Sequence, residues 1–127
     1  MYTDTLIRIK NSLARGKERV KIPYSKLDLE ILDALSRAGY LESATRKGRG
    51  VRRIIEVKLK YADAGVPSIA GIKFVSRPSR RLYSGYREIK RSRQGYGNFF
   101  ISTSGGIMTD IEARKKKVGG QVLFEIW

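Results

Sequence analysis

Ser102-Thr103-Ser104-Gly105-Gly106 is the stretch that decides how the C-terminal half of this sequence folds. It follows a run of apolar residues and predicts the end of a strand over residues 98–104. The two glycines predict a turn, because glycine adopts the backbone conformations that tight turns need. Thr109 then predicts the N-cap of a short helix, with Glu112 three residues later at the capping-box position.

The rest of the C-terminal half predicts short extended segments around this stretch. We expect strands over residues 69–76, 81–84 and 122–127, a helical turn over 86–90 and a basic loop over 91–97. Three consecutive lysines at 115–117 fall in the last turn of the short helix, where cations suit the negative end of the helix dipole. This half therefore reads as mostly β with one short helix.

The N-terminal half contains two segments with helical periodicity. The first covers residues 4–15 and ends at Gly16; the second begins at the N-cap Ser25 and ends at Gly39. The predicted buried stripe of the first helix is Leu6, Ile9 and Leu13. The predicted buried face of the second helix is Leu27, Ile31, Ala34, Leu35 and Ala38.

Strands complete the N-terminal half. A short strand is predicted over 19–22, and a hairpin joins residues 40–46 to 51–61. In the second hairpin strand every other residue is apolar, which predicts one buried and one solvated face. Residues 62–67 form the best linker. The expected fold class is therefore α+β with two closely packed lobes: an αβαββ lobe over 1–64 and a mostly β lobe over 65–127.

Composition limits the chemistry of the chain. It has 27 Lys plus Arg against 12 Asp plus Glu, a net charge of +15, and no Cys or His. Thiolate and imidazole metal sites, disulfides and His-based catalysis are therefore excluded, and we expect neither metal nor cofactor. No stretch of about 20 apolar residues is present to span a membrane. These exclusions leave a cytoplasmic protein as the expectation, and the net charge favours a polyanionic partner.

The charge divides at residue 70 into +7 before it and +8 after it, over fewer residues. Residues 77–93 carry seven cations and one acid, with tyrosines at 83, 86 and 96 interleaved or adjacent. Cations neutralise phosphates, and tyrosine rings stack on exposed bases. Nucleic-acid binding is the favoured interpretation; a cationic membrane surface and an ordinary solvated surface are alternatives.

The hydroxyl- and glycine-rich stretch admits several interpretations. Hydroxyls that donate and accept, glycines that allow close approach and a nearby helix start suit sugar hydroxyls, phosphates and base edges of a folded RNA. A purely structural strand–turn–helix connection also accounts for Thr109 and Glu112. A nucleotide-phosphate loop lacks the usual Gly-Lys-Ser/Thr. An RNA-modifying enzyme would need converging carboxylates, and a DNA reader a basic recognition helix.

Specific residues resemble a known family. The pattern Ser102-Thr103-Ser104-x-Gly106-x-Met108-Thr109-Asp110-x-x-Ala113-Arg114, followed by Val118-Gly119-Gly120, is similar to the signature of the bacterial small-subunit ribosomal protein eight family. Val75-Ser76-Arg77-Pro78-x-x-Arg81-x-Tyr83 resembles its second marker. Leu6-x-x-Ile9-x-Asn11 and Pro23-x-Ser25-Lys26-Leu27 resemble its N-terminal markers, so the resemblance covers the whole chain.

The resemblance implies a non-enzymatic protein of the ribosome that binds the central domain of small-subunit rRNA and helps assembly. It implies close rRNA contact by Ser102, Thr103, Ser104, Gly105 and Gly106. Flanking contacts would come from Arg80, Arg81, Tyr83, Gly120 and Gln121, and peripheral ones from Thr3, Arg8 and Asn11. Neighbouring small-subunit proteins are expected partners, and the protein's own messenger RNA is a further candidate. Gly105 and Gln121 depart from the family's usual Lys and Glu, which puts any role of those charges in doubt.

Overall fold

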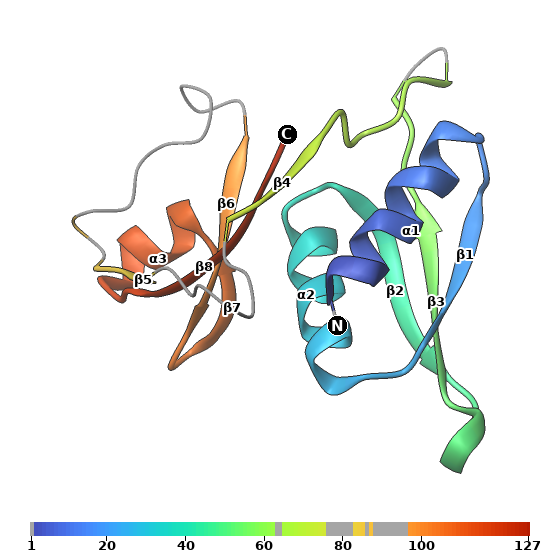
Figure 1. Cartoon of the computed structure of the whole chain (residues 1–127), viewed down its shortest axis with the longest axis horizontal. Coiled ribbons are helices and arrows are strands. Elements are labelled where there is room, and N and C mark those ends of the chain that lie inside the picture. The colour runs from blue at the N-terminus through green and yellow to red at the C-terminus, as the bar shows by residue number, and fades with distance from the viewer. Residues whose placement is uncertain (1, 63–64, 76–82, 86, 88–96) are drawn as a thin grey trace. The chain divides into compact units, whose positions relative to one another are not determined.

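The computed structural model describes residues 2–62, 65–75, 83–85, 87 and 97–127. The chain divides into two units, Met1–Ile69 and Ala70–Trp127 (Figure 1). The first unit contains α1 (Tyr2–Ala14), β1 (Arg19–Pro23), α2 (Lys26–Arg37), β2 (Leu41–Lys47), the 3-10 turn η1 (Gly50–Arg52) and β3 (Ile54–Leu59). The second contains β4 (Ile72–Phe74), β5 (Tyr83–Ser84), β6 (Asn98–Thr103), β7 (Gly106–Thr109), α3 (Asp110–Lys116) and β8 (Gly120–Ile126). The predicted α+β class and the αβαββ order of the first unit are confirmed.

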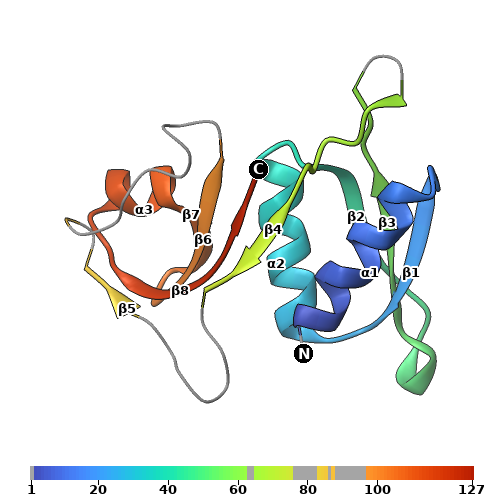
Figure 2. The ribbon, with the colours of Figure 1, turned by 45° about the horizontal axis from the view of Figure 1, so that its top comes forward.

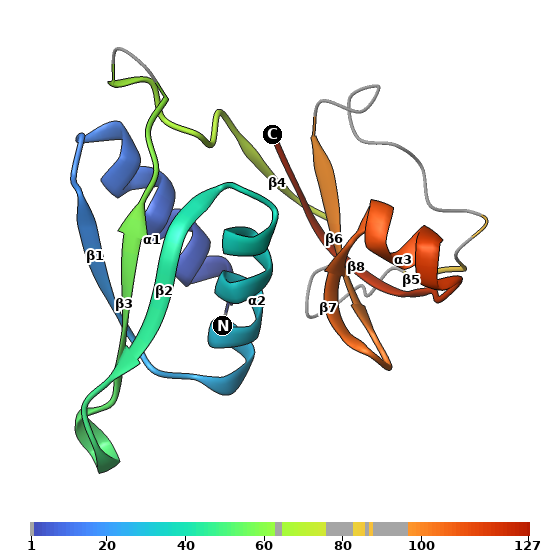
Figure 3. The same ribbon diagram turned by 180° about the vertical axis from the view of Figure 1, so that it is seen from behind.

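The first unit is an antiparallel sheet in the order β1-β3-β2 with both of its helices on one face (Figures 1 and 3). The central strand β3 alternates as its sequence predicts: Ile55 and Val57 are fully buried, and Glu56 and Lys58 lie on the other face. In α1 the predicted stripe is confirmed, because Leu6, Ile9 and Leu13 are all buried.

The predicted buried face of α2 is partly wrong. Ile31, Ala34 and Leu35 are buried, but Leu27 is 42% exposed and Ala38 is also exposed. Leu32 is fully buried in their place. Leu27 lies in the first turn of the helix and Ala38 at its C-cap. At the ends of a helix a residue on the apolar face is buried only if another element extends far enough to cover it. The Ser25 cap is confirmed, since its side chain accepts a hydrogen bond from the Asp28 amide.

Residues 65–69 hydrogen-bond within the first unit. The Ser68 amide donates to the Lys60 carbonyl, and the Ser68 hydroxyl donates to the Tyr40 carbonyl at 2.6 Å. Tyr61 and Pro67 form an isolated bridge. These bonds explain why the first unit extends to Ile69. A functional division into 1–64 and 65–127, and the close packing of the two lobes, stay predictions.

The second unit is an antiparallel sheet in the order β4-β8-β6-β7, with β5 paired to the start of β8. Helix α3 covers one face of this sheet (Figure 2). The residues buried there are Ile101, Met108, Ala113 and Val122. On the opposite face the rings of Phe100 and Phe124 stack, with centroids 5.1 Å apart. The long strand β8 thus brings β4, β5 and β6 into one sheet.

Several predicted elements in this unit change. The predicted strand over 69–76 is shorter, since β4 covers three residues. The helix α3 was predicted to follow the glycine turn directly, and this is wrong. The strand β7 lies between the turn and the helix and pairs with β6. The short strand over 81–84 is confirmed at Tyr83–Ser84, the part that the structure describes. The helical turn over 86–90 and the loop over 91–97 fall almost entirely outside the described residues.

Candidate nucleic-acid interface

The hydroxyl- and glycine-rich stretch forms the tip of the β6–β7 hairpin. Thr103 and Gly106 are the last paired residues, so Ser104 and Gly105 form a two-residue loop. Gly106 has a φ of 108°, a conformation that side chains disfavour, which explains glycine at this position. Ser104, Gly105 and Gly106 are exposed, and Ser102 and Thr103 are half-buried. The turn therefore offers backbone and hydroxyl groups to solvent.

The three hydroxyls have different roles. The Thr103 hydroxyl accepts a hydrogen bond from the Gly105 amide at 3.1 Å and donates to the Gly106 carbonyl at 2.8 Å. It is therefore a structural part of the turn. Within the described part of the chain, the hydroxyls of Ser102 and Ser104 have no hydrogen-bond partner. These two are the hydroxyls available to a ligand.

Gly119 and Gly120 let three strands meet beside this turn. A Cβ atom on Gly120 would lie 2.0 Å from the Ser102 carbonyl oxygen, and one on Gly119 would lie 2.4 Å from the Ser84 carbonyl oxygen. Both are backbone contacts that cannot move aside like a flexible side chain. The start of β8 is thus held between the end of β5 and the end of β6.

Strand register brings together three candidate residues that are far apart in the sequence. Gln121 of β8 pairs with Tyr83 of β5 on one side and with Ser102 of β6 on the other. Directly paired residues in neighbouring strands carry their side chains on the same face. Tyr83, Gln121 and Ser102, here called the polar row, therefore share one face of the sheet. Tyr83 is 68% exposed, and the other two are half-buried.

The remaining candidates are two cations and three residues of α1. Arg80 and Arg81 lie outside the described residues. Thr3, Arg8 and Asn11 lie on α1 in the first unit, where Thr3 is half-buried and the other two are exposed. The Arg8 guanidinium donates to the Lys21 carbonyl at 3.4 Å.

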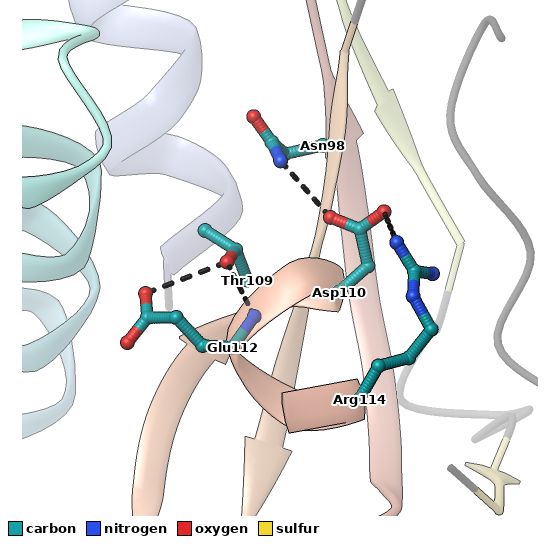
Figure 4. Close-up of polar contacts among 5 residues, drawn as sticks. All are labelled: Asn98, Thr109, Asp110, Glu112 and Arg114. Atoms are coloured by element: carbon teal, nitrogen blue, oxygen red, sulfur yellow. Dashed lines mark hydrogen bonds and ion pairs between the residues drawn. The ribbon is translucent and has the colours of Figure 1, made fainter. Parts of the chain in front are cut away.

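The polar side chains at the start of α3 bond within the protein (Figure 4). The Thr109 hydroxyl accepts from the Glu112 amide, and Thr109 is buried, so the predicted cap is confirmed. Asp110 is buried, accepts from the Asn98 amide nitrogen at 2.9 Å, and pairs with Arg114 at 3.4 Å. The structural interpretation therefore accounts for this helix start, which is not an open phosphate site.

The first unit has a pocket of about 220 Å³ whose lining includes two acidic residues. Its lining residues are Asp4, Thr5, Arg8, Ile22, Pro23 and Asp28. One carboxylate oxygen of Asp28 is buried and lacks a hydrogen-bond partner among the described residues. The hypothesis of an RNA-modifying enzyme requires more than this, namely two carboxylates that converge in a concave site. In the parts of the chain that are described, no group of three acidic residues could hold a metal ion.

Sequence reasoning missed a cationic feature at the β2–β3 connection, which it treated only as a turn. Residues 46–53, here called the basic arm, contain five Lys or Arg and no acid. The guanidinium carbons of Arg46 and Arg53 lie over the Tyr24 ring, 5.7 Å and 4.6 Å from its centroid. The local density of cations without acids was the signal that could have found it.

Together these features define a class: a strongly cationic α+β protein whose candidate site is an exposed binding surface. Of the helices that the structure describes, none is long and apolar enough to span a bilayer. The family model described as ribosomal protein S8 matches residues 1–127. The chain belongs to this family, whose members are structural, non-enzymatic proteins, and the resemblance seen in the motifs is confirmed.

Individual relatives match over nearly their full length. The small ribosomal subunit protein uS8 of a Nitratiruptor species is 42% identical over 130 residues, covering 100% of this chain and 97% of the relative. The protein of the same name from Nautilia profundicola is 42% identical with the same two coverages. The one from Rubrobacter xylanophilus is 43% identical over 120 residues, covering 94% of this chain and 91% of the relative.

Proposed function

We propose that this chain is a component of the small ribosomal subunit in the cytoplasm, that it binds the central domain of small-subunit rRNA directly, and that it helps assembly. The main surface is the polar row together with the turn Ser102–Gly106. Gly120 supports it. Arg80 and Arg81, which the sequence selects, are proposed as further cationic contacts with rRNA. Its partners are small-subunit rRNA and the neighbouring ribosomal proteins.

The observation that carries the proposal is the pairing of Gln121 with both Tyr83 and Ser102. It joins three segments of the chain, which the family resemblance implies as rRNA contacts, into one continuous face. The close backbone contact at Gly120 fixes this arrangement from within the sheet.

The chemistry of this face suits an irregular RNA. The Gln121 amide both donates and accepts hydrogen bonds, as do the hydroxyls of Ser102 and Ser104, so they can match base edges and 2′-hydroxyls. The exposed Tyr83 ring offers a stacking surface for an unpaired base. The turn itself carries no charge, and the net charge of +15 supplies attraction that does not depend on sequence. Discrimination then resides in the neutral groups.

A peripheral contact and a second ligand complete the proposal. Thr3, Arg8 and Asn11 on α1 make peripheral contacts with rRNA through the first unit. The protein's own messenger RNA is a second ligand for the same polar row, because a messenger that folds like the ribosomal site would present the same groups. Competition between the messenger and the rRNA fragment for one surface tests this second point.

The proposal is tested by removing the two unpartnered hydroxyls. Ser102→Ala with Ser104→Ala should weaken binding to a central-domain rRNA fragment by about 1–3 kcal/mol for each hydroxyl whose partner is left buried and unpaired. That is a factor of roughly 5 to 140 each at about 1.4 kcal/mol per tenfold. Thr103 is kept, because its hydroxyl stabilises the turn.

The matched control removes two exposed hydroxyls from the first unit, Ser43→Ala with Thr45→Ala. It should bind the fragment like the wild type. Equal affinities of the wild type and the Ser102/Ser104 variant, at one fixed salt concentration, would exclude the turn as the discriminating surface.

A further inference from the structure

The basic arm, residues 46–53, projects from the end of the three-stranded sheet in the first unit (Figures 1 and 3). Its cations are Arg46, Lys47, Arg49, Arg52 and Arg53. Protein surfaces normally intersperse charges of both signs, but no acid lies within these eight residues. Such a segment creates a local positive potential in addition to the charge of the whole chain.

Among the arm's described side chains, Lys47 is the one cation that the protein neutralises. Lys47 lies 3.1 Å from a Glu56 carboxylate oxygen whose partner oxygen is 3.0 Å from Arg19. Among the described side chains, Arg46, Arg49 and Arg53 form no ion pair with a carboxylate. They are exposed, so their guanidinium groups remain available to an external anion.

The arm is also partly ordered for binding. Tyr24 holds the Arg46 and Arg53 guanidinium groups over its ring. The Arg53 Nε donates to the Gly50 carbonyl at 3.0 Å, which leaves its terminal nitrogens for a ligand. A guanidinium fixed in this way loses less freedom when it binds than a free side chain does.

We propose that the basic arm is a second RNA-binding surface, separate from the polar row, that grips the phosphate backbone. Planar guanidinium groups bind phosphate oxygens in a bidentate manner, and several cations along an arm match regularly spaced phosphates. An acidic protein partner is less suited, because protein interfaces have an apolar core. The only large apolar side chain among residues 46–53 is Val51, which is fully exposed and packs against nothing. The identification of the polyanion as RNA rests on the proposed function. The location of this second site at the basic arm does not.

The first experiment measures the salt dependence of binding. Arg46→Gln with Arg49→Gln removes two cations of the arm and leaves Arg53 and its hydrogen bond to Gly50 in place. Binding of the full chain to a bacterial small-subunit rRNA transcript and to a generic RNA duplex should lose affinity on both. The slope of log affinity against log salt should decrease by about two, one for each phosphate contact.

The matched control is Lys17→Gln with Lys60→Gln, which removes the same charge at the opposite end of the same sheet. Its slope should change by less than half as much. An arm variant whose slope equals that of the wild type, or changes only as much as the control, overturns the proposal. So does an arm variant that binds RNA normally but no longer binds an acidic ribosomal protein.

The second experiment uses the absence of cysteine from the chain. Val51→Cys gives one unhindered attachment point for an iron chelate that cleaves nearby RNA. Glu18→Cys, at the far end of the sheet, is the control. Cleavage of the rRNA from position 51 at sites not cleaved from position 18 supports the arm contact. No cleavage, or equal cleavage from both positions, contradicts it.

The two proposals fail separately. When Arg46→Gln and Arg49→Gln are added to the Ser102→Ala/Ser104→Ala variant, the salt dependence of binding to the generic duplex should still decrease. If the turn variant binds rRNA like the wild type, the polar row is wrong and the arm result still stands. If the arm variant has no effect in either background, the arm is wrong and the polar row still stands.

Discussion

Gly120 lies so close to Ser102 that a single methyl group at position 120 would come within 2.0 Å of the Ser102 carbonyl oxygen. This contact joins the start of β8 to the end of β6, where Gln121 pairs with Ser102. Glycine at position 120 therefore allows β8 and β6 to approach closely beside the Gln121–Ser102 pair of the polar row.

Gly120→Ala should disrupt this junction. A methyl group there collides with backbone, so β8 must shift, and overpacking of this kind costs about 1–3 kcal/mol. The free energy of unfolding in urea should fall by about that amount, and rRNA affinity should fall with it. Gly85→Ala is the control, because a Cβ at Gly85 has nothing within 4 Å. Equal stability of the two variants would show that the junction tolerates side chains.

Thr103→Val should loosen the turn without removing the Ser102 and Ser104 hydroxyls. It deletes the hydrogen bonds to the Gly105 amide and the Gly106 carbonyl, worth about 0.5–1.5 kcal/mol each. Amide hydrogen exchange at Gly105 should become faster. Thr103→Ser keeps the hydroxyl and should retain the slow exchange. Similar exchange in all three proteins would mean that the hydroxyl does not order the turn.

Glu56 predicts a specific pH dependence of stability. The hydrogen bond from Lys47, with the charges of Lys47 and Arg19, lowers the pKa of Glu56 below its ordinary value of 4.5. The folded state thus favours the charged carboxylate. This contribution is complete above pH 4.5 and is lost as the pH falls through the lower pKa of the folded state.

Glu56→Gln should therefore be less stable than the wild type near neutral pH, and the two urea midpoints should converge as the pH falls below 4.5. High salt should reduce the difference, because the side chains of Lys47 and Arg19 are exposed. Glu30→Gln is the control, since Glu30 has no ion pair among the described residues. A constant difference at every pH would refute the assignment.

Asn98→Ala should destabilise the second unit. It removes the donor 2.9 Å from a carboxylate oxygen of the buried Asp110 (Figure 4). Leaving that oxygen short of a donor should cost about 1–3 kcal/mol. A double-mutant cycle with Asp110→Asn should give a clear coupling energy between the two residues. Replacement of the exposed Asn11 by Ala should change stability by less than about 0.5 kcal/mol.

Local sequence signals predicted much of the fold. The caps at Ser25 and Thr109, the stripe of Leu6, Ile9 and Leu13, and the alternation in β3 each depend on neighbouring residues, and all are confirmed. The strand β7 was missed, because its four residues begin with a glycine that was assigned to the turn. At the ends of α2, burial depends on what covers the helix, which periodicity alone does not reveal.

The candidate site was only partly predictable. The motif signalled the hydroxyls and glycines, but their different roles depend on side-chain geometry: Thr103 bonds within the turn, whereas Ser102 and Ser104 do not. The pairing of Gln121 with Tyr83 and Ser102 depends on long-range register, which local sequence does not encode. The basic arm was visible in the sequence, but its cation–π contacts with Tyr24 appear only in the folded chain.

The most direct test of the central claim is a hydroxyl-radical footprint on full-length small-subunit rRNA, made with the wild type and with the Ser102→Ala/Ser104→Ala variant. We expect the wild type to protect a compact set of nucleotides in the central domain, and the variant to lose that protection at the same protein and salt concentrations. Protection outside the central domain, or an identical footprint from both proteins, would contradict the account.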